Sequence, residues 1–196
     1  MMDARFAKQI AFLQEADRLK GVLRATPVLN GTRAENSGEH SWHIALYALI
    51  LGEHAEPGVS LDRAVRMLLV HDLVEIDAGD VPIHLAVDPE AQAAKEHAAA
   101  ERLFGLLPAD QAAELRALWE EFEAGESADA RYARAVDRMQ PLFLNLASGG
   151  GSWIDYDVEM SQIDTRVGSK IKRGLPQLWP LVRDRVLPWF KDAGRA

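Results

Sequence analysis

Ionisable side chains crowd one otherwise apolar stretch of the chain, LLVHDLVEIDAGDVP, which covers residues 68–82. Residues three or four positions apart share one face of a helix, so His71, Asp72 and Glu75 are expected to point into the same space. Burying a histidine and two carboxylates among leucines and valines is costly unless a cation offsets their charge. A lone His-Asp pair is more often a core histidine beside a capping carboxylate, but this crowding predicts a divalent metal ion.

Further ligands must come from other parts of the chain. His40 and His43 begin a second apolar helix, GEHSWHIALYALI, and their spacing of three residues does not choose between them. A fourth ligand should be a carboxylate on another buried helix, and ARAVDRMQPLFLNL offers Asp137. Taken alone, Asp137 could equally pair with Arg134 or Arg138.

Composition limits what such a site could bind. The chain has 196 residues, a net charge of −8 and no cysteine, so a metal must be held by histidines and carboxylates. The negative charge argues against nucleic acid or an anionic membrane as partner, and an anionic substrate would need a local cation. No apolar run is long enough to span a bilayer and no signal peptide is recognisable, which favours a cytoplasmic protein.

The elements that must position these residues are helices. Apolar residues recur with a spacing near 3.6 through almost the whole sequence and alternating runs are nearly absent, so the fold class is predicted to be all-α, in one domain. A long loop, GVLRATPVLNGTRAENSGE, follows the first helix. The expected helices, with their breaks, cover about residues 3–20, 40–56, 60–79, 89–105, 108–125 and 127–148, with two more between 157 and 190. Pro141 should kink the sixth helix or divide it.

The ordered set of candidate ligands resembles a known family. His40, the pair His71-Asp72 and Asp137, on successive helices, are similar to the H…HD…D signature of the HD-domain metal-dependent phosphohydrolases. The segments EHSWH, LLVHDLVEIDAGDVP, LWEEFEAGESADARYARAVDRMQP and LNLASGGGSW resemble the short members grouped with 5'-deoxynucleotidases. The resemblance covers about residues 18–155. It implies a single HD domain over residues 1–196, with a helical-bundle core at about 18–155 and additional C-terminal helices at 157–191.

The resemblance also implies a ligand set and a metal. It assigns His40 rather than His43, together with His71, Asp72 and Asp137, to one divalent ion. Two imidazoles and two carboxylates suit Mn, Co, Ni, Fe, Zn or Mg, and the identity stays open.

The same family pattern implies roles for residues around the metal. Glu75 and Asp80 match residues implicated in catalysis: Glu75 would take a proton from water or orient it, Asp80 would protonate the leaving oxygen, and the two roles could be exchanged. Arg24 in KGVLRAT matches an arginine that contacts the phosphate. The sequence departs from the pattern at Ala25, where a tryptophan that helps to select deoxyribose is usual.

The function implied is therefore a phosphomonoesterase acting on nucleoside or deoxynucleoside 5'-monophosphates, and the family suggests a homodimer. Two alternatives remain at this point. An HD-type hydrolase could act on another phosphoester, such as a cyclic dinucleotide or an alarmone, although the Gly-Tyr-Pro element of the former is missing. A helical module could instead bind a nucleotide or metal without hydrolysis.

Overall fold

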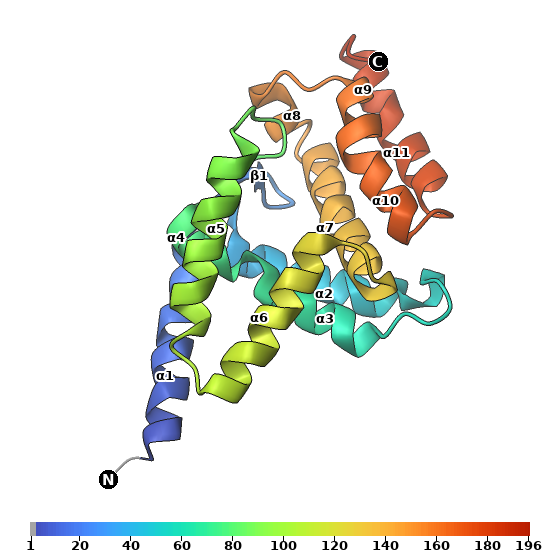
Figure 1. Ribbon diagram of the computed structural model, residues 1–196. Helices are drawn as coiled ribbons and strands as arrows, with labels where there is room; N and C mark the ends of the chain where they lie inside the picture. The colour runs from blue at the N-terminus through green and yellow to red at the C-terminus, as the bar shows by residue number, and fades with distance from the viewer. Residues whose placement is uncertain (1–2) are drawn as a thin grey trace.

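The computed structural model describes residues 3–196, which form a helical bundle with one small hairpin (Figure 1). The longer helices are α1 (Ala4–Ala16), α2 (Ser37–Ile50), α3 (Leu61–Val70), α5 (Pro89–Phe104), α6 (Ala109–Ala124), α7 (Ala128–Ala147) and α11 (Trp179–Asp192). Shorter segments are the 3-10 turns η1 (Asp17–Gly21), η2 (Leu51–His54) and η3 (His71–Val74), the helices α4 (Glu75–Ala78), α8 (Ser152–Asp155), α9 (Met160–Gln162) and α10 (Ser169–Gly174), and the π-helical segment η4 (Ile163–Gly168). The prediction of an all-α HD-type bundle is confirmed.

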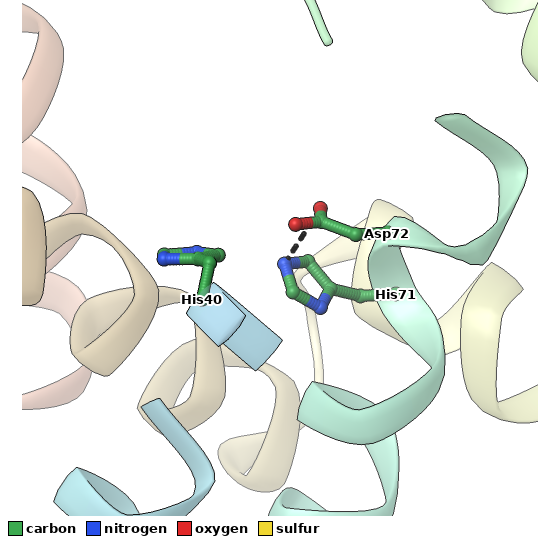
Figure 2. A group of neighbouring side chains, drawn as sticks. All are labelled: His40, His71 and Asp72. Atoms are coloured by element: carbon green, nitrogen blue, oxygen red, sulfur yellow. Dashed lines mark ion pairs between the residues drawn. The ribbon is translucent and has the colours of Figure 1, made fainter. Parts of the chain in front are cut away.

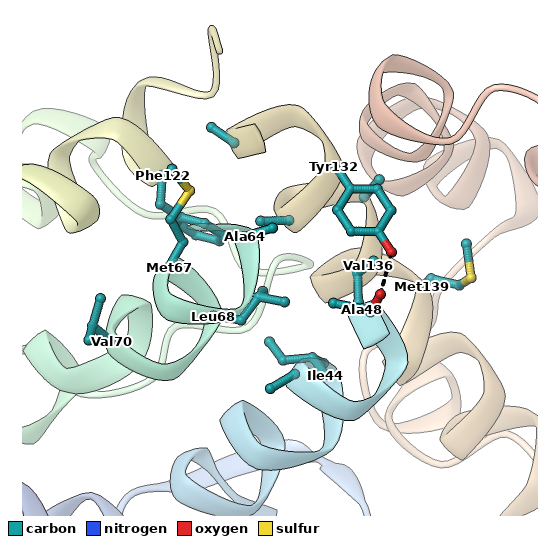
Figure 3. Packing of buried hydrophobic residues seen from close by; sticks show 14 of the residues in the cluster. Ile44, Ala48, Ala64, Met67, Leu68, Val70, Phe122, Tyr132, Val136 and Met139 are labelled. Atoms are coloured by element: carbon teal, nitrogen blue, oxygen red, sulfur yellow. Dashed lines mark hydrogen bonds between the residues drawn. The ribbon is translucent and has the colours of Figure 1, made fainter. Parts of the chain in front are cut away.

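Helix α7 runs through the middle of the molecule (Figure 1). It packs against α2, α3 and α6 on one side and against α10 and α11 on the other. The buried core is one continuous cluster that extends from Phe12 to Phe190, and so includes the C-terminal helices. Figure 3 shows Ile44 of α2, Leu68 of α3 and Val136 of α7 packed together at its centre. The candidate ligands thus stand on elements that share one core.

Local sequence signals set several helix ends. Asp88 caps α5 by accepting hydrogen bonds from the amides of Glu90 and Ala91, with Pro89 at the first helical position. Ser127 caps α7 in the same way. Pro141 lies inside α7, which continues to Ala147 as one helix and is not divided.

Three parts of the chain differ from the sequence prediction. The loop after the first helix contains an antiparallel hairpin, in which β1 (Leu23–Pro27) pairs with β2 (Ala34–Asn36). Helix α3 ends at Val70, so His71 and Asp72 lie in the 3-10 turn η3 instead of mid-helix. A 3-10 turn has three residues per turn, so the adjacent His71 and Asp72 side chains are about 120° apart around the axis instead of about 100° as in an α-helix. The predicted first helix likewise ends at Ala16, before η1.

No helix within residues 3–196 is long and apolar enough to cross a bilayer.

Candidate metal centre

Three candidate ligands meet in one buried cluster (Figure 2). His40 comes from the first turn of α2, whereas His71 and Asp72 come from η3. One nitrogen or oxygen atom from each of the three lies within 4.8 Å of the others. Asp137 of α7 reaches the same point, because its Oδ1 is 2.9 Å from His40 Nε2 and 3.9 Å from His71 Nε2. All four side chains are buried.

A chain of hydrogen bonds fixes the orientation of the His40 ring. The carboxylate of Glu35 can only accept, so the amide nitrogen of Gln140 donates to Glu35 Oε1 at 2.7 Å. The amide oxygen of Gln140 then faces His40 Nδ1 at 3.1 Å, and Nδ1 must donate to it. In a neutral ring the Nε2 lone pair of His40 is therefore directed at Asp137.

A hydrogen bond from Nδ1 also orients the ring of His71. Its Nδ1 donates to the backbone carbonyl oxygen of Leu68 at 2.9 Å, one turn earlier. Its Nε2 lies 2.8 Å from Asp72 Oδ1 but makes no hydrogen bond of acceptable geometry, although it is buried. Burial alone would lower the pKa of His71, but the negative charges of Asp72 and Asp137 raise it to about 9.

These residues fit a divalent metal ion. Two imidazole Nε2 atoms that lie 2.8 Å and 2.9 Å from carboxylate oxygens require a positive charge nearby, either a proton or a metal, to offset the repulsion of their lone pairs. Nitrogen and oxygen donors in this ratio suit first-row divalent metals, and hydrogen bonds from the far ring nitrogens are the usual support for metal-ligating histidines. Asp137 also forms one of the two ion pairs considered from the sequence, because Arg138 Nε lies 3.5 Å from its Oδ2. Arg134, the other candidate partner, donates to the carbonyl oxygens of Phe122 and Glu123 instead.

Glu75 stands beside the cluster at the start of α4. Its Oε2 accepts a hydrogen bond of 2.6 Å from the hydroxyl group of Ser37, which is fully buried. Burial, together with the nearby charges of Asp72 and Asp80, raises the pKa of Glu75 to about 9. In the absence of a metal this carboxyl group is therefore protonated at neutral pH.

Arg24 of β1 lies among carboxylates. Its Nη1 donates to Asp72 Oδ2 at 3.1 Å and lies 3.4 Å from Asp80 Oδ1, while its Nε lies 3.7 Å from Glu35 Oε2. Burial opposes the charged form, but the carboxylates of Asp72, Asp80 and Glu75 raise the pKa of Arg24, which stays protonated. Burial also raises the pKa of Asp80, which follows Gly79, the residue at which α4 ends with a positive φ of 76°.

An open cavity of about 190 Å³ adjoins this cluster. Its lining is rich in ionisable side chains, and apolar residues, Ala25 among them, make up much of the rest. The ionisable residues are Arg24, His71, Asp72, Glu75, Asp80, His84, Glu96, Glu123, Asp137 and Arg138. The apolar lining includes Pro141, Leu142, Trp153, Ile163 and Val167, and the polar side chain of Asn145 lies on the same cavity. A small ligand could therefore place a charged group at the cluster and an uncharged part against the apolar wall.

The structure brings together every residue that the sequence analysis placed at the site: His40, His71, Asp72, Asp137, Glu75, Asp80 and Arg24. The other histidines lie elsewhere. His43 is separated from the cluster by Gln140 and packs edge-on against Tyr47, while His97 packs edge-on against Trp119. Which side chains bind a metal stays a prediction.

Sequence reasoning missed three residues that support the site, Glu35, Ser37 and Gln140. Each is buried, and together they link α2, α7 and β2 through the hydrogen bonds described above. Ser37 precedes His40 by three residues and Gln140 follows Asp137 by three, so helical spacing could have indicated these two. Glu35 lies on a short strand in a polar loop, and no local pattern marks it.

Comparison with known proteins shows which family the sequence matches. The sequence matches the model of the HD domain family over residues 16–179. It is 32% identical over 134 residues to the human protein 5'-deoxynucleotidase HDDC2, in a match covering 68% of this chain and 64% of that one. The Bos taurus protein of the same name is 34% identical over 144 residues, which cover 72% and 68% of the two chains. The matched part thus spans about two thirds of the length of these relatives.

A solved structure is similar over nearly the whole chain. The crystal structure of a "Predicted metal-dependent phosphohydrolase" from Magnetospirillum magnetotacticum MS-1 has a TM-score of 0.91 and 45% sequence identity, covering 97% of this chain and 98% of that one. The family match extends from the end of α1 to the start of α11, and so contains α2, η3 and α7, the elements that carry the clustered histidines and aspartates. This chain belongs to the HD domain family.

Proposed function

We propose that the protein is a metal-dependent phosphohydrolase that removes the phosphate group from nucleoside 5'-monophosphates. The observation that carries this proposal is the pair of buried imidazole Nε2 atoms close to the carboxylates of Asp72 and Asp137, beside an open cavity. The relatives named 5'-deoxynucleotidase support the substrate class, and the Magnetospirillum structure supports the metal dependence.

In this proposal His40, His71, Asp72 and Asp137 hold one divalent ion, whose identity among Mn, Co, Ni, Fe, Zn and Mg is left to experiment. A bound ion would supply positive charge that polarises a phosphate oxygen and lowers the pKa of water. The hydrogen bonds from His40 Nδ1 to Gln140 and from His71 Nδ1 to Leu68 keep both Nε2 atoms available for this purpose.

Glu75 and Asp80 are proposed to move protons. Ser37 occupies Oε2 of Glu75, so the other oxygen is free to accept a proton from an attacking water. Asp80 lines the same cavity, and burial raises its pKa, which favours a protonated form able to donate to the leaving oxygen. Positive charge brought into the cluster would favour the ionised form of Glu75 that the proton transfer requires.

Arg24 is proposed to attract the phosphate group, because its guanidinium remains charged in an otherwise acidic cavity. Ala25, which also lines the cavity, offers only a methyl group where a bulky side chain could contact the sugar. We therefore expect no strong preference of this site for deoxyribonucleotides over ribonucleotides.

The competing candidate is a module that binds a nucleotide without hydrolysing it. Two buried carboxyl groups with raised pKa, on Glu75 and Asp80, favour hydrolysis, since a site for binding alone has no use for them. The discriminating experiment incubates the protein with Mn, Co or Mg and a panel of ribo- and deoxyribonucleoside 5'-monophosphates, with a nucleoside triphosphate and a cyclic dinucleotide alongside. Release of phosphate from the monophosphates supports the proposal. Binding without release, with every metal, would favour the module.

We also propose that the protein forms a homodimer. Large hydrophobic side chains on α2 and α11 are exposed to solvent, among them Trp42, Ile50 and Leu181. Ile50 and Leu181 line a second, apolar cavity of about 500 Å³ between these two helices. Sedimentation of the wild-type protein and of Leu181→Glu tests the idea: a wild-type monomer would rule it out, and a dimer that the substitution leaves intact would place its interface elsewhere.

A further inference from the structure

The charges of the active-site cavity are unevenly distributed. Two arginines, Arg24 and Arg138, line it, and so do six carboxylates: Asp72, Glu75, Asp80, Glu96, Glu123 and Asp137. A phosphate dianion entering this space needs donors that the protein has not already used. The two arginines each have a buried Nε without a hydrogen-bond partner, but Arg24 has three carboxylates within 4 Å and Arg138 has one.

The guanidinium of Arg24 already contacts carboxylates of the protein. One of its nitrogens already donates to Asp72, and Asp80 and Glu35 lie within 3.4 Å and 3.7 Å of its guanidinium. To bind a phosphate with its planar fork, Arg24 would have to give up a buried contact with a proposed metal ligand or with Asp80. Its charge is therefore largely balanced before any substrate arrives.

Arg138 is in a different position on the cavity wall. Within residues 3–196 no protein acceptor takes a hydrogen bond from its guanidinium, and its Nε is buried. Its single close carboxylate is Asp137, whose Oδ2 lies 3.5 Å from that Nε. The side chain is 31% exposed, which fits a guanidinium that lies at the mouth of the cavity.

The surroundings of Arg138 suit an anion. Pro141 and Asn145 follow it at intervals of three and four residues on α7, so one face of the helix lines the cavity from Arg138 inward. His84 lies on the same cavity, and burial together with Arg166 and Arg138 lowers its pKa to about 4. His84 is thus neutral, and its buried Nδ1 has no hydrogen-bond partner in the described residues. This side of the cavity offers unused polar groups.

We propose that Arg138 is a second anion-binding residue of the site, which donates hydrogen bonds from its free nitrogens to the phosphate group of the substrate and of the phosphate product. This inference rests on the proposed phosphohydrolase function but assigns a contact that Arg24 alone cannot provide. Arg24, whose charge the carboxylates of the cluster partly balance, still attracts the phosphate group, while Arg138 supplies the hydrogen-bond donors that no protein group uses.

The test measures inorganic phosphate, which requires no turnover. Binding of phosphate to the metal-loaded protein is measured by calorimetry for the wild type, Arg138→Gln and Arg138→Lys. A charge-assisted bidentate contact predicts at least about tenfold weaker phosphate binding in Arg138→Gln. Arg138→Lys keeps the charge but loses the fork, so its loss should be smaller. The KM for a nucleoside monophosphate should rise in parallel.

Two further measurements separate recognition of the anion from a purely structural role. Arg131→Gln removes the same charge two turns earlier on α7, from a side chain that donates to the carbonyl oxygen of Glu126, and should leave phosphate binding unchanged. Metal affinity is measured for each variant by chelator competition. If Arg138→Gln alters metal affinity but not phosphate binding, Arg138 serves only Asp137 and the inference is overturned.

The outcomes also distinguish this inference from the proposed function. A wild-type protein that hydrolyses monophosphates, with phosphate binding insensitive to Arg138→Gln, retains the function and refutes the inference. A protein that hydrolyses nothing but binds phosphate through Arg138 refutes the function and retains the anion site.

Discussion

Gln140 offers a sharp test of how the cluster is held. The side chain is fully buried, accepts from His40 Nδ1 and donates to Glu35 Oε1. Gln140→Met keeps the length of the side chain but removes both of these hydrogen bonds, together with the contact of its Nε2 with His43 Nδ1 at 3.1 Å. Two buried polar groups are then left unpaired, at about 1–3 kcal/mol each, so the free energy of unfolding should fall by roughly 2–6 kcal/mol.

The same substitution should weaken the metal site. Without its acceptor the His40 ring is free to rotate or change tautomer, and loss of such a supporting contact lowers metal affinity by about 10–100-fold. Metal affinity is measured by titrating the metal-free protein with Co or Mn against a chelating dye, and stability by denaturant unfolding of the metal-free form. Gln111→Met is the matched control, because Gln111 accepts one hydrogen bond from Gln9 far from the site. A variant that loses stability but binds metal as tightly as the wild type would refute the role assigned to Gln140.

Three further predictions test other parts of the account. Glu75→Gln should retain its metal and lose at least about 100-fold in kcat, because the group that accepts the proton is gone; near-normal turnover would remove Glu75 from the mechanism. Burial opposes protonation of His71, but Asp72 raises its pKa to about 9 in the metal-free protein. Protons then compete with the metal below that value, so metal affinity should rise with pH up to about 9 with protons released on binding, and an affinity that is flat between roughly pH 6 and pH 9 would contradict this. Gly174→Ala places a methyl group 2.1 Å from the carbonyl oxygen of Arg131, where α10 meets α7, and should cost about 1–3 kcal/mol of unfolding free energy; an unchanged melting temperature would show that the two helices separate easily.

Local signals in the sequence were sufficient for most of the helices. The Asp88-Pro89 pair and Ser127 define helix starts through hydrogen bonds to neighbouring amides, and such contacts depend on a few adjacent residues. The end of α3 at Val70 could not be predicted in this way. A 3-10 turn of only four residues is too short for its apolar spacing to be distinguished from that of an α-helix. The hairpin was missed for a related reason, since strands of five and three residues in a polar loop show no clear alternation.

The proposed ligands of the candidate site could be predicted from the sequence, whereas the contacts that support them could not. Its proposed ligands could be placed in one cluster because the order of His40, His71-Asp72 and Asp137 resembled a family. The supporting contacts were not visible, since Gln140 and Glu35 are 105 positions apart in the sequence and only the tertiary fold brings them together. The different surroundings of two cavity arginines likewise depend on that fold.

The most direct test of the account follows phosphate release as metal is returned to the metal-free protein. With a nucleoside 5'-monophosphate as substrate, the rate should be negligible without metal, rise with added Mn or Co, and saturate near one ion per chain. Asp72→Ala, which removes a proposed ligand from the cluster, should show neither metal retention nor turnover. Release that is independent of metal, or that persists in Asp72→Ala, would contradict the claim that this cluster holds the ion on which hydrolysis depends.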